Sequence, residues 1–451
     1  MKLTKISLAA LVALGTFSVA SATPLEEAIK GIDVGGSLLY RYDNATEKKT
    51  SKNEDGKSVE EKDSKGKAKF NAVLNFNAAL ADDFFGVVTA RYTSQDKLGH
   101  TLGATGKLQP DAYDVTYTDN AFEFNEFYLG YKAANTTITA GKQQLGTFFT
   151  DDAVGTGIRV INSDIEGLTL AAVGFGAIEN HEIESDGDLW KAVRYLNHAE
   201  TKYKDGKLVI EKDKDAKLDI GNLYGIAAMG NYDPVSFQLW YASLENVADL
   251  FAVELASDFA ISDDLSFGLK GQYVTTDADG EMKKQVEDYS DGDFYAFEAT
   301  TGLYGVDLSA GYVGWKVKTH NKKGQDNKMV AKDGVTSFSL EDQGSLIDAG
   351  EYNHYDYTWL SGKGGFFFAT AGYNFDKFFV GVDYKNGQNK FADKESVKEK
   401  HEEVVGRLSY NYSKKLKFTT WYAATTTKNV DGKKDTKEDG STYRFQAKYS
   451  F

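Results

Sequence analysis

Residues Tyr443-Arg-Phe-Gln-Ala-Lys-Tyr-Ser-Phe451 end the chain and are the most informative segment for its fold class. Positions 443, 445, 447, 449 and 451 are aromatic or apolar, whereas positions 444, 446, 448 and 450 are polar. A period of two residues is typical of a β-strand with one apolar and one polar face. One such segment does not distinguish a soluble β-sandwich from a membrane barrel, so the fold class depends on whether the pattern recurs.

The alternation recurs from one end of the chain to the other. Residues 34–42, 70–80 and 404–412 each place an apolar residue or glycine at every second position. Continued along the chain, the same period predicts eighteen strands. Their expected positions are residues 31–42, 68–80, 84–94, 121–132, 136–145, 156–163, 167–177, 220–232, 235–244, 248–260, 264–275, 292–304, 306–318, 363–375, 377–385, 403–413, 416–427 and 441–451.

The connections between the predicted strands alternate in length. Several are turns of two or three residues, such as 81–83, 133–135 and 414–415. Short periplasmic turns and long external loops are typical of outer-membrane barrels, whereas a stack of soluble sandwich domains would not separate the two lengths so consistently. We therefore predict an all-β fold, an 18-stranded antiparallel transmembrane β-barrel, for residues 23–451. The predicted external loops are residues 43–67, 95–120, 178–219, 276–291, 319–362, 386–402 and 428–440.

The amino-terminal segment has the pattern of a secretory signal peptide. A basic head, Met1-Lys-Leu-Thr-Lys5, precedes an apolar run and the small-residue sequence Ala20-Ser-Ala22. The apolar run is shorter than the roughly 20 residues that a spanning helix needs, which disfavours the alternative of an uncleaved anchor. We expect residues 1–22 to be removed on export. No later apolar run is long enough for a spanning helix, so a membrane location depends on strands.

The composition narrows the possible functions. The chain has 28 phenylalanines, 27 tyrosines and only three prolines, which suits long strands whose N–H groups must pair. It has no cysteine, so disulfides and thiolate metal sites are excluded. Its formal net charge is −15, and loss of Lys2 and Lys5 with the signal peptide makes it more negative. Such a chain is not expected to bind nucleic acid through a general basic field, but it would attract cations.

The aromatic residues of the last strand also suggest how the barrel assembles. Tyr443, Phe445, Tyr449 and Phe451 would lie on the lipid-facing side, and the chain ends on an aromatic carboxyl terminus. This ending resembles the signal that the outer-membrane barrel assembly machinery recognises. We therefore expect that machinery to be a partner, and outer-membrane lipid and lipopolysaccharide to surround the folded barrel.

The opposite phase of each strand would face a water-filled interior, where any chemistry would take place. Five basic residues fall in this phase, on strands that become neighbours when the barrel closes: Arg41, Arg91, Arg407, Arg444 and Lys448. They predict a basic wall along one side of the interior, in the constriction of a pore. The alternative is that these interior charges are scattered and neutralised by one another.

One connection differs from the others. Residues 146–155, Gly-Thr-Phe-Phe-Thr-Asp-Asp-Ala-Val-Gly, are too apolar for an ordinary external loop. With Phe148 and Phe149 as anchors, this loop is expected to fold into the barrel and to place Asp151 and Asp152 opposite the basic wall. The predicted result is a narrow slot with a transverse field, which would orient polar solutes and set ion preference.

Several stretches of the chain resemble the Campylobacter-type major outer-membrane porins. The likeness covers most strands and turns and is poor in the predicted loops 43–67, 178–219 and 319–362. The resemblance implies a trimer of eighteen-stranded, cation-preferring channels for small hydrophilic solutes, with a calcium ion near the constriction. Asp151 and Asp152 fall in a matching stretch, so they would be candidate calcium ligands. The matching stretches are residues 24–29, 140–145, 150–153, 154–161, 165–172, 221–225 and 341–346.

Other functional classes fit the sequence less well. A membrane phospholipase would need a Ser–His–acid set near its lipid-facing surface. All six histidines fall in predicted external loops and none on a strand: His100, His181, His198, His320, His354 and His401. A plugged transporter of about 22 strands would need a globular domain before its first strand. A structural or adhesive surface protein with variable loops is the main alternative to a channel.

Overall fold

The computed structural model describes residues 32–52, 58–102, 117–179, 189, 200–204, 207–211, 221–262, 264–286, 288–323, 329–353, 355, 357–391, 398–430 and 436–451. The predicted signal peptide at residues 1–22 lies outside these residues, as do His181, His198 and His354. Within the described residues, eighteen strands form one continuous antiparallel sheet.

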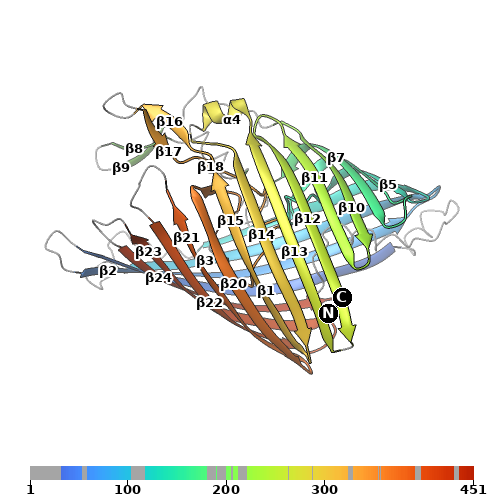
Figure 1. The fold of residues 1–451 in the computed structure, drawn as a ribbon. Helices are drawn as coiled ribbons and strands as arrows, with labels where there is room; N and C mark the ends of the chain where they lie inside the picture. Colours follow the sequence, from blue (N-terminus) through green and yellow to red (C-terminus); the bar gives the residue numbers. More distant parts are fainter. Residues whose placement is uncertain are drawn as a thin grey trace.

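These eighteen strands form the wall of a barrel (Figure 1). Each of them corresponds to one of the strands predicted from the period of two. Their bounds are β1 (Ile32–Lys52), β2 (Ser58–Ala79), β3 (Phe84–Leu102), β4 (Tyr117–Ala133), β5 (Thr136–Gln144), β6 (Val154–Asn162), β7 (Leu168–Glu179), β10 (Leu223–Tyr232), β11 (Val235–Leu244), β12 (Ala248–Ser262), β13 (Leu265–Ala278), β14 (Gly292–Leu303), β15 (Val306–Val317), β20 (Lys363–Phe375), β21 (Phe378–Lys390), β22 (Lys398–Asn411), β23 (Leu416–Val430) and β24 (Thr436–Ser450).

Six shorter strands form two-stranded ribbons outside this sheet. They are β8 (Glu200–Lys204) with β9 (Lys207–Glu211), β16 (His320–Lys323) with β17 (Met329–Lys332), and β18 (Val335–Thr336) with β19 (Leu360–Ser361). A short helix, α4 (Gly280–Gln285), follows Asp279, whose carboxylate accepts a hydrogen bond from the Glu281 N–H at 2.7 Å. Among the described residues, no helix has the length and apolar character needed to cross a membrane.

Pairing between the first and last strands closes the barrel. β1 lies opposite β24 from the pair Ser37 and Ser450 to the pair Thr50 and Lys437, while the other edge of β1 pairs with β2. The sheet therefore has no free edge that would leave a row of backbone groups without partners. The prediction of an 18-stranded antiparallel barrel is confirmed.

Short turns gather at one end of the barrel and long connections at the other. Ala134 and Asn135, for example, reverse the chain between β4 and β5. Phe451 lies at the short-turn end, where its N–H donates to the Gly36 carbonyl at 3.1 Å. Helix α4 and the β16–β17 ribbon lie at the other end, at the top of Figure 1. We refer to these as the short-turn end and the long-loop end.

Several predicted loops are shorter than expected because the strands continue past the apolar region, and two of them show this clearly. β1 and β2 extend through most of residues 43–67, and β3 enters residues 95–120. In the β1–β2 extension, polar side chains pair across the strands, as where Lys48 Nζ lies 2.9 Å from Glu60 Oε1. Both faces of this extension are polar, so the alternation that identified the strands is absent there.

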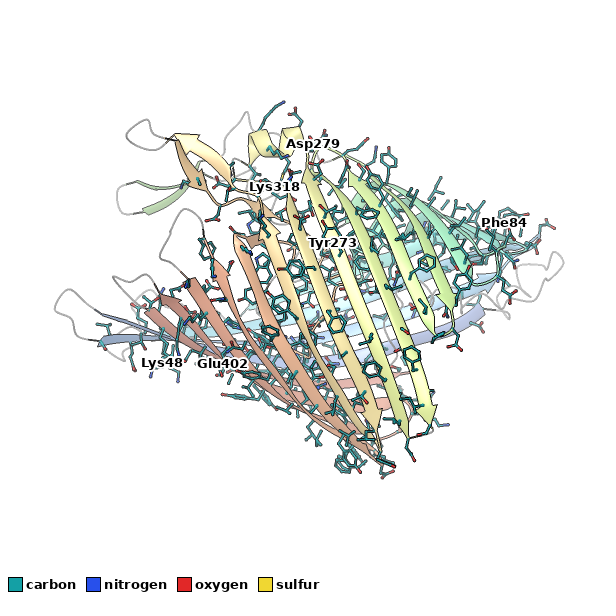
Figure 2. The ribbon with its side chains drawn as sticks, viewed as in Figure 1. Lys48, Phe84, Tyr273, Asp279, Lys318 and Glu402 are labelled. Atoms are coloured by element: carbon teal, nitrogen blue, oxygen red, sulfur yellow. The ribbon has the colours of Figure 1, made fainter. Side chains whose placement is uncertain are left out.

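The outer face of the wall is apolar. Tyr273, Phe297 and Phe367 project outward and are 43%, 50% and 67% exposed. Figure 2 shows Tyr273 on the outer surface of β13. Many other large apolar side chains are exposed in the same phase of their strands, and a surface of this kind suits contact with lipid rather than water.

The inner face of the wall is not uniformly polar. From β11 to β15 its buried side chains are large and apolar, and they include Trp240, Leu250, Val274, Phe294 and Trp315, each at most 1% exposed. These residues belong to one core cluster that also contains residues of the connections. An interior filled only with water would be lined by polar groups. This half of the interior is therefore covered by other parts of the chain.

Candidate functional site in the barrel interior

Two connections fold inward and cover the apolar half of the wall. The short insert is residues 145–153, between β5 and β6, and the long insert is residues 335–361, before β20. On β13, the Thr276 hydroxyl donates to the Ser337 carbonyl at 2.6 Å. Thr276 is three residues from outward-facing Tyr273, so it lies on the inner face of the strand. The long insert therefore lies inside the barrel.

The position of the long insert corrects the prediction that the whole of residues 319–362 is an external loop. Phe338, Leu340 and Tyr357 are each at most 1% exposed. The sequence contained a signal for this burial, because the segment is rich in apolar and aromatic residues, the criterion that identified the short insert. The length of the connection and its many polar residues concealed that signal.

Two adjacent phenylalanines anchor the short insert. Phe148 and Phe149 are fully buried, and their rings meet edge to face with centroids 5.6 Å apart. The Phe149 carbonyl accepts hydrogen bonds from the Leu340 N–H and the Ser339 hydroxyl, both at 2.8 Å. The Phe148 carbonyl accepts one from the Ser345 N–H at 2.8 Å. The two inserts therefore form one packed unit.

Gly344 allows the inserts to approach each other this closely. Its φ of +54° falls in the left-handed region, which disfavours residues with a side chain. A Cβ atom at this position would also lie 2.6 Å from the Phe148 carbonyl oxygen. A larger residue would thus strain the backbone and push the two inserts apart.

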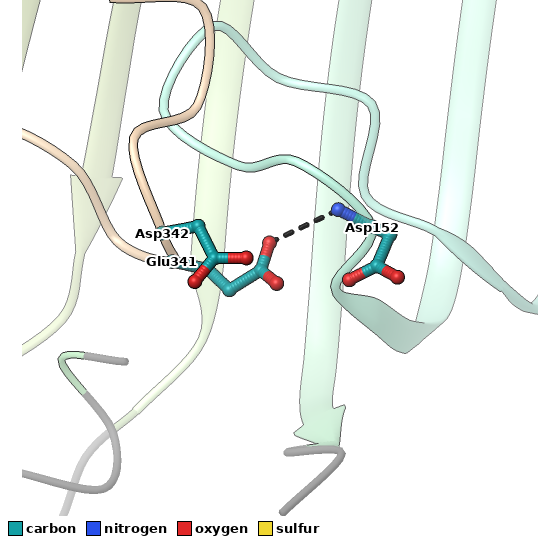
Figure 3. A group of neighbouring side chains, drawn as sticks. All are labelled: Asp152, Glu341 and Asp342. Carbon is teal, nitrogen blue, oxygen red and sulfur yellow. Dashed lines mark hydrogen bonds between the residues drawn. The ribbon is translucent and has the colours of Figure 1, made fainter. Parts of the chain in front are cut away.

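A carboxylate of the long insert binds the turn of the short insert. Glu341 Oε2 accepts hydrogen bonds from the backbone N–H groups of residues 151–153 at 2.8, 3.1 and 3.1 Å. Figure 3 shows the contact with Asp152 and the neighbouring side chain of Asp342. Carboxylate oxygens of Asp152, Glu341 and Asp342 lie within 4.8 Å of one another. Three acids are therefore concentrated where the inserts meet, and we call this group the carboxylate junction.

This crowding changes the acidity of Glu341. Burial, followed by a hydrogen bond with Asp152 and repulsion from Asp152 and Asp342, raises the pKa of Glu341 to about 9. The N–H group of Asp151 lowers this pKa but does not outweigh those effects. Because a buried carboxylate beside two others is unfavourable, Glu341 retains a proton at neutral pH unless a cation compensates its charge.

Arg91 supplies positive charge beside the carboxylate junction. It is 7% exposed on β3, and its Nη2 lies 3.9 Å from Asp152 Oδ2. The sequence predicted that Asp152 would face Arg91 across an open slot, whereas the structure brings the two side chains into contact. The side chain of Asp151, in contrast, is exposed to solvent.

Two of the predicted basic residues have acidic partners on the wall itself. Arg444 Nε lies 2.5 Å from Asp43 Oδ1, and Arg407 Nη2 lies 2.6 Å from Asp383 Oδ1. Sequence reasoning did not single out Asp43 or Asp383, although both fall in the inward phase of their strands. These pairs fit the alternative that interior charges neutralise one another, at least at these two positions.

Arg41 and Lys448 also face the interior. Arg41 Nε donates to Gln446 Oε1 at 3.1 Å, and the Lys448 side chain is exposed. Their inward direction follows from the outward position of Tyr40 and Tyr449, which are 45% and 39% exposed. The inner faces of β1 and β24 therefore carry basic and amide groups.

The long insert extends as far as β23. The rings of Tyr352 and Trp421 lie with centroids 5.9 Å apart, and Arg444 Cζ lies 5.0 Å from the centroid of the Trp421 ring. Asp348 and Glu351, in the same stretch of the insert, have exposed side chains. The insert therefore brings acidic side chains to the neighbourhood of the basic residues on β24.

A buried polar cluster holds the long insert against β21 and β22. Lys385 Nζ donates to the Tyr352 carbonyl and lies 3.2 Å from Glu403 Oε1. His401 Nε2 lies 3.6 Å from Glu403 Oε2. Lys385, His401 and Glu403 are each at most 3% exposed. The insert is thus fixed to the wall by charge-assisted contacts as well as by apolar packing.

The prediction that no histidine lies on a strand is wrong. His401 lies on β22 and His100 on β3, because these strands extend further toward the long-loop end than the apolar alternation indicates. His320 lies on β16, in the separate β16–β17 ribbon. His401 faces inward beside Glu403, away from the apolar outer surface. It therefore does not have the lipid-facing position that a membrane phospholipase would need.

Comparisons with known proteins agree with this architecture. A family model described as Campylobacter major outer membrane protein matches residues 1–451, whereas no curated protein sequence matches the chain. The structure of Pseudomonas aeruginosa OccK7 (OpdD) is similar with a TM-score of 0.61 and 10% identity, over 93% of this chain and 99% of that chain. Acinetobacter baumannii OccAB3 has a TM-score of 0.60 and 11% identity over 93% and 99%. Pseudomonas aeruginosa OprD has a TM-score of 0.57 and 15% identity over 93% and 95%; at such identities the likeness shows the fold alone.

Proposed function

The chain belongs to the Campylobacter major outer membrane protein family, and from this premise we propose that it is a porin that conducts cations and small hydrophilic solutes by passive diffusion. Its location in the outer membrane follows from the family and from the 18-stranded barrel. We propose two properties of this channel: it prefers cations to anions, and it lets small hydrophilic solutes pass.

The acidic groups on the inserts are the observation that carries this proposal. Asp152, Glu341 and Asp342 meet at the carboxylate junction, and Asp151 beside them is exposed. Carboxylates that line a constriction favour cations over anions in channels. Such a local field is screened over roughly 8–10 Å at physiological salt, so the preference should be greatest at low ionic strength.

The basic residues of the wall do not reverse this preference. Arg407 and Arg444 are paired with Asp383 and Asp43, so each pair adds little net charge. Arg91 is paired with Asp152 at the junction. The formal net charge of the chain is −15, which also favours entry of cations.

We also propose that the carboxylate junction binds a calcium ion. Asp152, Glu341 and Asp342 offer oxygen ligands, the type that calcium takes. A divalent cation would compensate both the burial and the repulsion that raise the pKa of Glu341. Asp151, predicted as a ligand, is not in this group and instead donates its N–H to Glu341. The bound ion would offset part of the negative charge of the junction, while exposed Asp151 beside it would keep its own. Calcium should raise the thermal unfolding midpoint of the wild-type protein but not that of Asp342→Asn.

Membership of the family supports two further proposals about assembly. We propose that three copies form a homotrimer and that the barrel assembly machinery inserts each chain. Native mass spectrometry of the detergent-extracted protein should give the mass of three mature chains. A monomeric mass under mild extraction would contradict the first of these proposals.

Conductance in planar bilayers tests the proposed function directly. The refolded protein should give stable stepwise currents, and a potassium chloride gradient should give a reversal potential of the sign that potassium preference requires. Reversal at zero or at the opposite sign would contradict the cation preference. A correctly folded barrel that gives no current steps would instead support the structural or adhesive alternative.

A further inference from the structure

Two rows of lysines cross neighbouring strands at the long-loop end of the barrel. The first row runs over β15, β20, β21 and β22, where successive members lie directly opposite one another: Lys316, Lys363, Lys390 and Lys398. The second row runs over β22, β23 and β24 in the same way: Lys400, Lys428 and Lys437. We call these residues the lysine rows.

The lysine rows face outward. Lys363 shares the phase of Phe367, which is 67% exposed, and Lys400 shares the phase of Val404, which is 42% exposed. Residues four apart on a strand are separated by about 13 Å, so the lysines lie roughly that far beyond these apolar residues. The long-loop end of an outer-membrane barrel is extracellular, which puts the rows near the headgroups of the outer leaflet.

The sheet itself does not compensate the charge of these lysines. Like charges directly opposite each other on neighbouring strands destabilise a sheet. Lys437 pairs with Asp439 at 2.7 Å. For the other six lysines, no carboxylate of the described residues lies within ion-pair distance. Among the described residues, the two rows therefore present a positively charged surface that a negatively charged ligand would complement.

The lysine rows border a surface cleft of about 510 Å³. Four lysines and one carboxylate line it: Lys363, Lys390, Lys400, Lys428 and Glu402. Figure 2 shows Glu402 near the long-loop end of β22. Positively charged side chains therefore outnumber negatively charged ones in the lining of the cleft.

Aromatic side chains line the same cleft. They include Tyr295, Tyr312 and Phe367, and the rings of Tyr312 and Phe367 lie 4.7 Å apart. Aromatic residues of this kind mark the level of the membrane interface, where one end of a side chain meets apolar surroundings and the other meets water. A ligand of the cleft would therefore contact both cationic and aromatic groups.

We propose that this cleft binds the phosphate-bearing headgroup of a lipid in the outer leaflet. The lysine ammonium groups would contact the phosphate oxygens, and the aromatic residues would contact the adjoining part of the acyl chains. A free phosphate ion would use the lysines alone, so the aromatic lining favours a lipid. The inference rests on the outer-membrane location of the barrel and not on whether the barrel conducts ions.

Two matched variants test the proposal in the full-length protein. The site variant carries four substitutions in the cleft: Lys363→Gln, Lys390→Gln, Lys400→Gln and Lys428→Gln. The control variant carries the same chemical change at or beside the turns of the short-turn end: Lys377→Gln, Lys414→Gln, Lys415→Gln and Lys417→Gln. Both variants lose four positive charges, so a difference in lipid binding between them is due to the position of the lysines in the cleft. Heat-modifiable migration in gels confirms that each barrel is folded.

Native mass spectrometry then measures binding of bisphosphorylated lipid A and of lipid A from which the phosphates have been removed. We expect the wild-type protein and the control variant to bind lipid A alike, and the site variant to bind it at least about tenfold more weakly. Dephosphorylated lipid A should bind the wild-type protein as weakly as lipid A binds the site variant. Millimolar sodium phosphate should not displace lipid A.

Three results would overturn the proposal. They are equal binding of lipid A by the site and control variants, equal binding of the two forms of lipid A, and displacement of lipid A by sodium phosphate, which would indicate a site for free phosphate. A variant with arginine at the four cleft positions keeps the charge and should retain binding. If the site variant does not fold, the pair Lys363→Gln and Lys400→Gln gives the same comparison with two substitutions. Conductance of the same samples reports the porin function separately.

Discussion

The side chain of Glu341 accepts a hydrogen bond from the backbone N–H of Asp152, a residue 189 positions earlier in the chain, at 3.1 Å. The same oxygen accepts bonds from the N–H groups of Asp151 and Ala153. This carboxyl group joins the two inserts to each other. The arrangement of the interior therefore depends on its presence and on its protonation.

Stability should depend on pH through Glu341. Its pKa rises from 4.5 to about 9 on folding, so the folded protein binds this proton more tightly than the unfolded chain. The stabilising effect is complete below about pH 4.5, decreases as the pH rises, and is lost above about pH 9. The thermal unfolding midpoint should therefore fall between these limits in calcium-free buffer. Glu341→Gln should reduce that fall, whereas Glu402→Gln on the outer surface should leave it unchanged; equal profiles for all three proteins would refute the prediction.

Cation preference should decrease when both aspartates of the short insert are neutralised. Asp151→Asn with Asp152→Asn keeps the shape of the loop and removes two charges, one of them beside Arg91. The permeability ratio of potassium to chloride should fall about fivefold or more, since each unit charge near the path contributes on the order of 1 kcal/mol. Reversal potentials at low ionic strength measure this change. Asp82→Asn with Asp83→Asn, in the turn between β2 and β3, makes the same charge change far from the interior and should have no effect.

Replacement of the last residue should impair assembly more than stability. Phe451 is 42% exposed on the outer face, and its ring lies 6.1 Å from that of Tyr449. Phe451→Ala should destabilise the folded barrel by only about 1–3 kcal/mol. The yield of heat-modifiable protein in cells should nevertheless fall markedly, because the assembly signal is lost. Tyr412→Ala removes another exposed aromatic residue at the short-turn end and should assemble normally; equal yields for the two variants would show that Phe451 is not a signal.

Labelling of single cysteines should report the orientation of the barrel, because the chain has no cysteine of its own. A membrane-impermeant maleimide should react with Ser58→Cys in intact cells, since Ser58 is exposed at the long-loop end. Lys414→Cys, in a short turn, should react only after the outer membrane is opened. Phe338→Cys should stay unlabelled until the protein is unfolded, because Phe338 is fully buried in the long insert. The reverse pattern for Ser58 and Lys414 would invert the topology.

The wall of the barrel could be predicted from the sequence because it follows a local rule. Each strand of the membrane region alternates apolar and polar residues. A segment of about ten residues is enough to show this period, as in the segments that begin at Tyr443 and at Val404. The rule fails where both faces of a strand meet water, so the sequence predicts a loop for the extension around Lys48 although this extension is a strand. It also placed His401 in a loop, although that residue continues β22 beyond Val404.

The interior could be predicted only in part because its contacts are not local. The inward position of the short insert followed from the unusual pair Phe148 and Phe149. The partners of that pair, and the role of Glu341, depend on residues about 190 positions away, and no periodic pattern connects them. The same holds for Arg407 and its acid Asp383, which come together as diagonal neighbours only when β21 and β22 pair.

The distance in sequence between the two inserts also sets an order of events during biogenesis. Residues 149–153 bind residues 339–341, and the strands from β6 to β15 lie between them in the chain. Closing so long a loop is entropically costly, and the intervening wall must be in place before these contacts can form. We therefore expect the wall of a newly inserted barrel to form before the two inserts meet. During that interval the barrel would be wider, and more permeable to large compounds, than the finished protein.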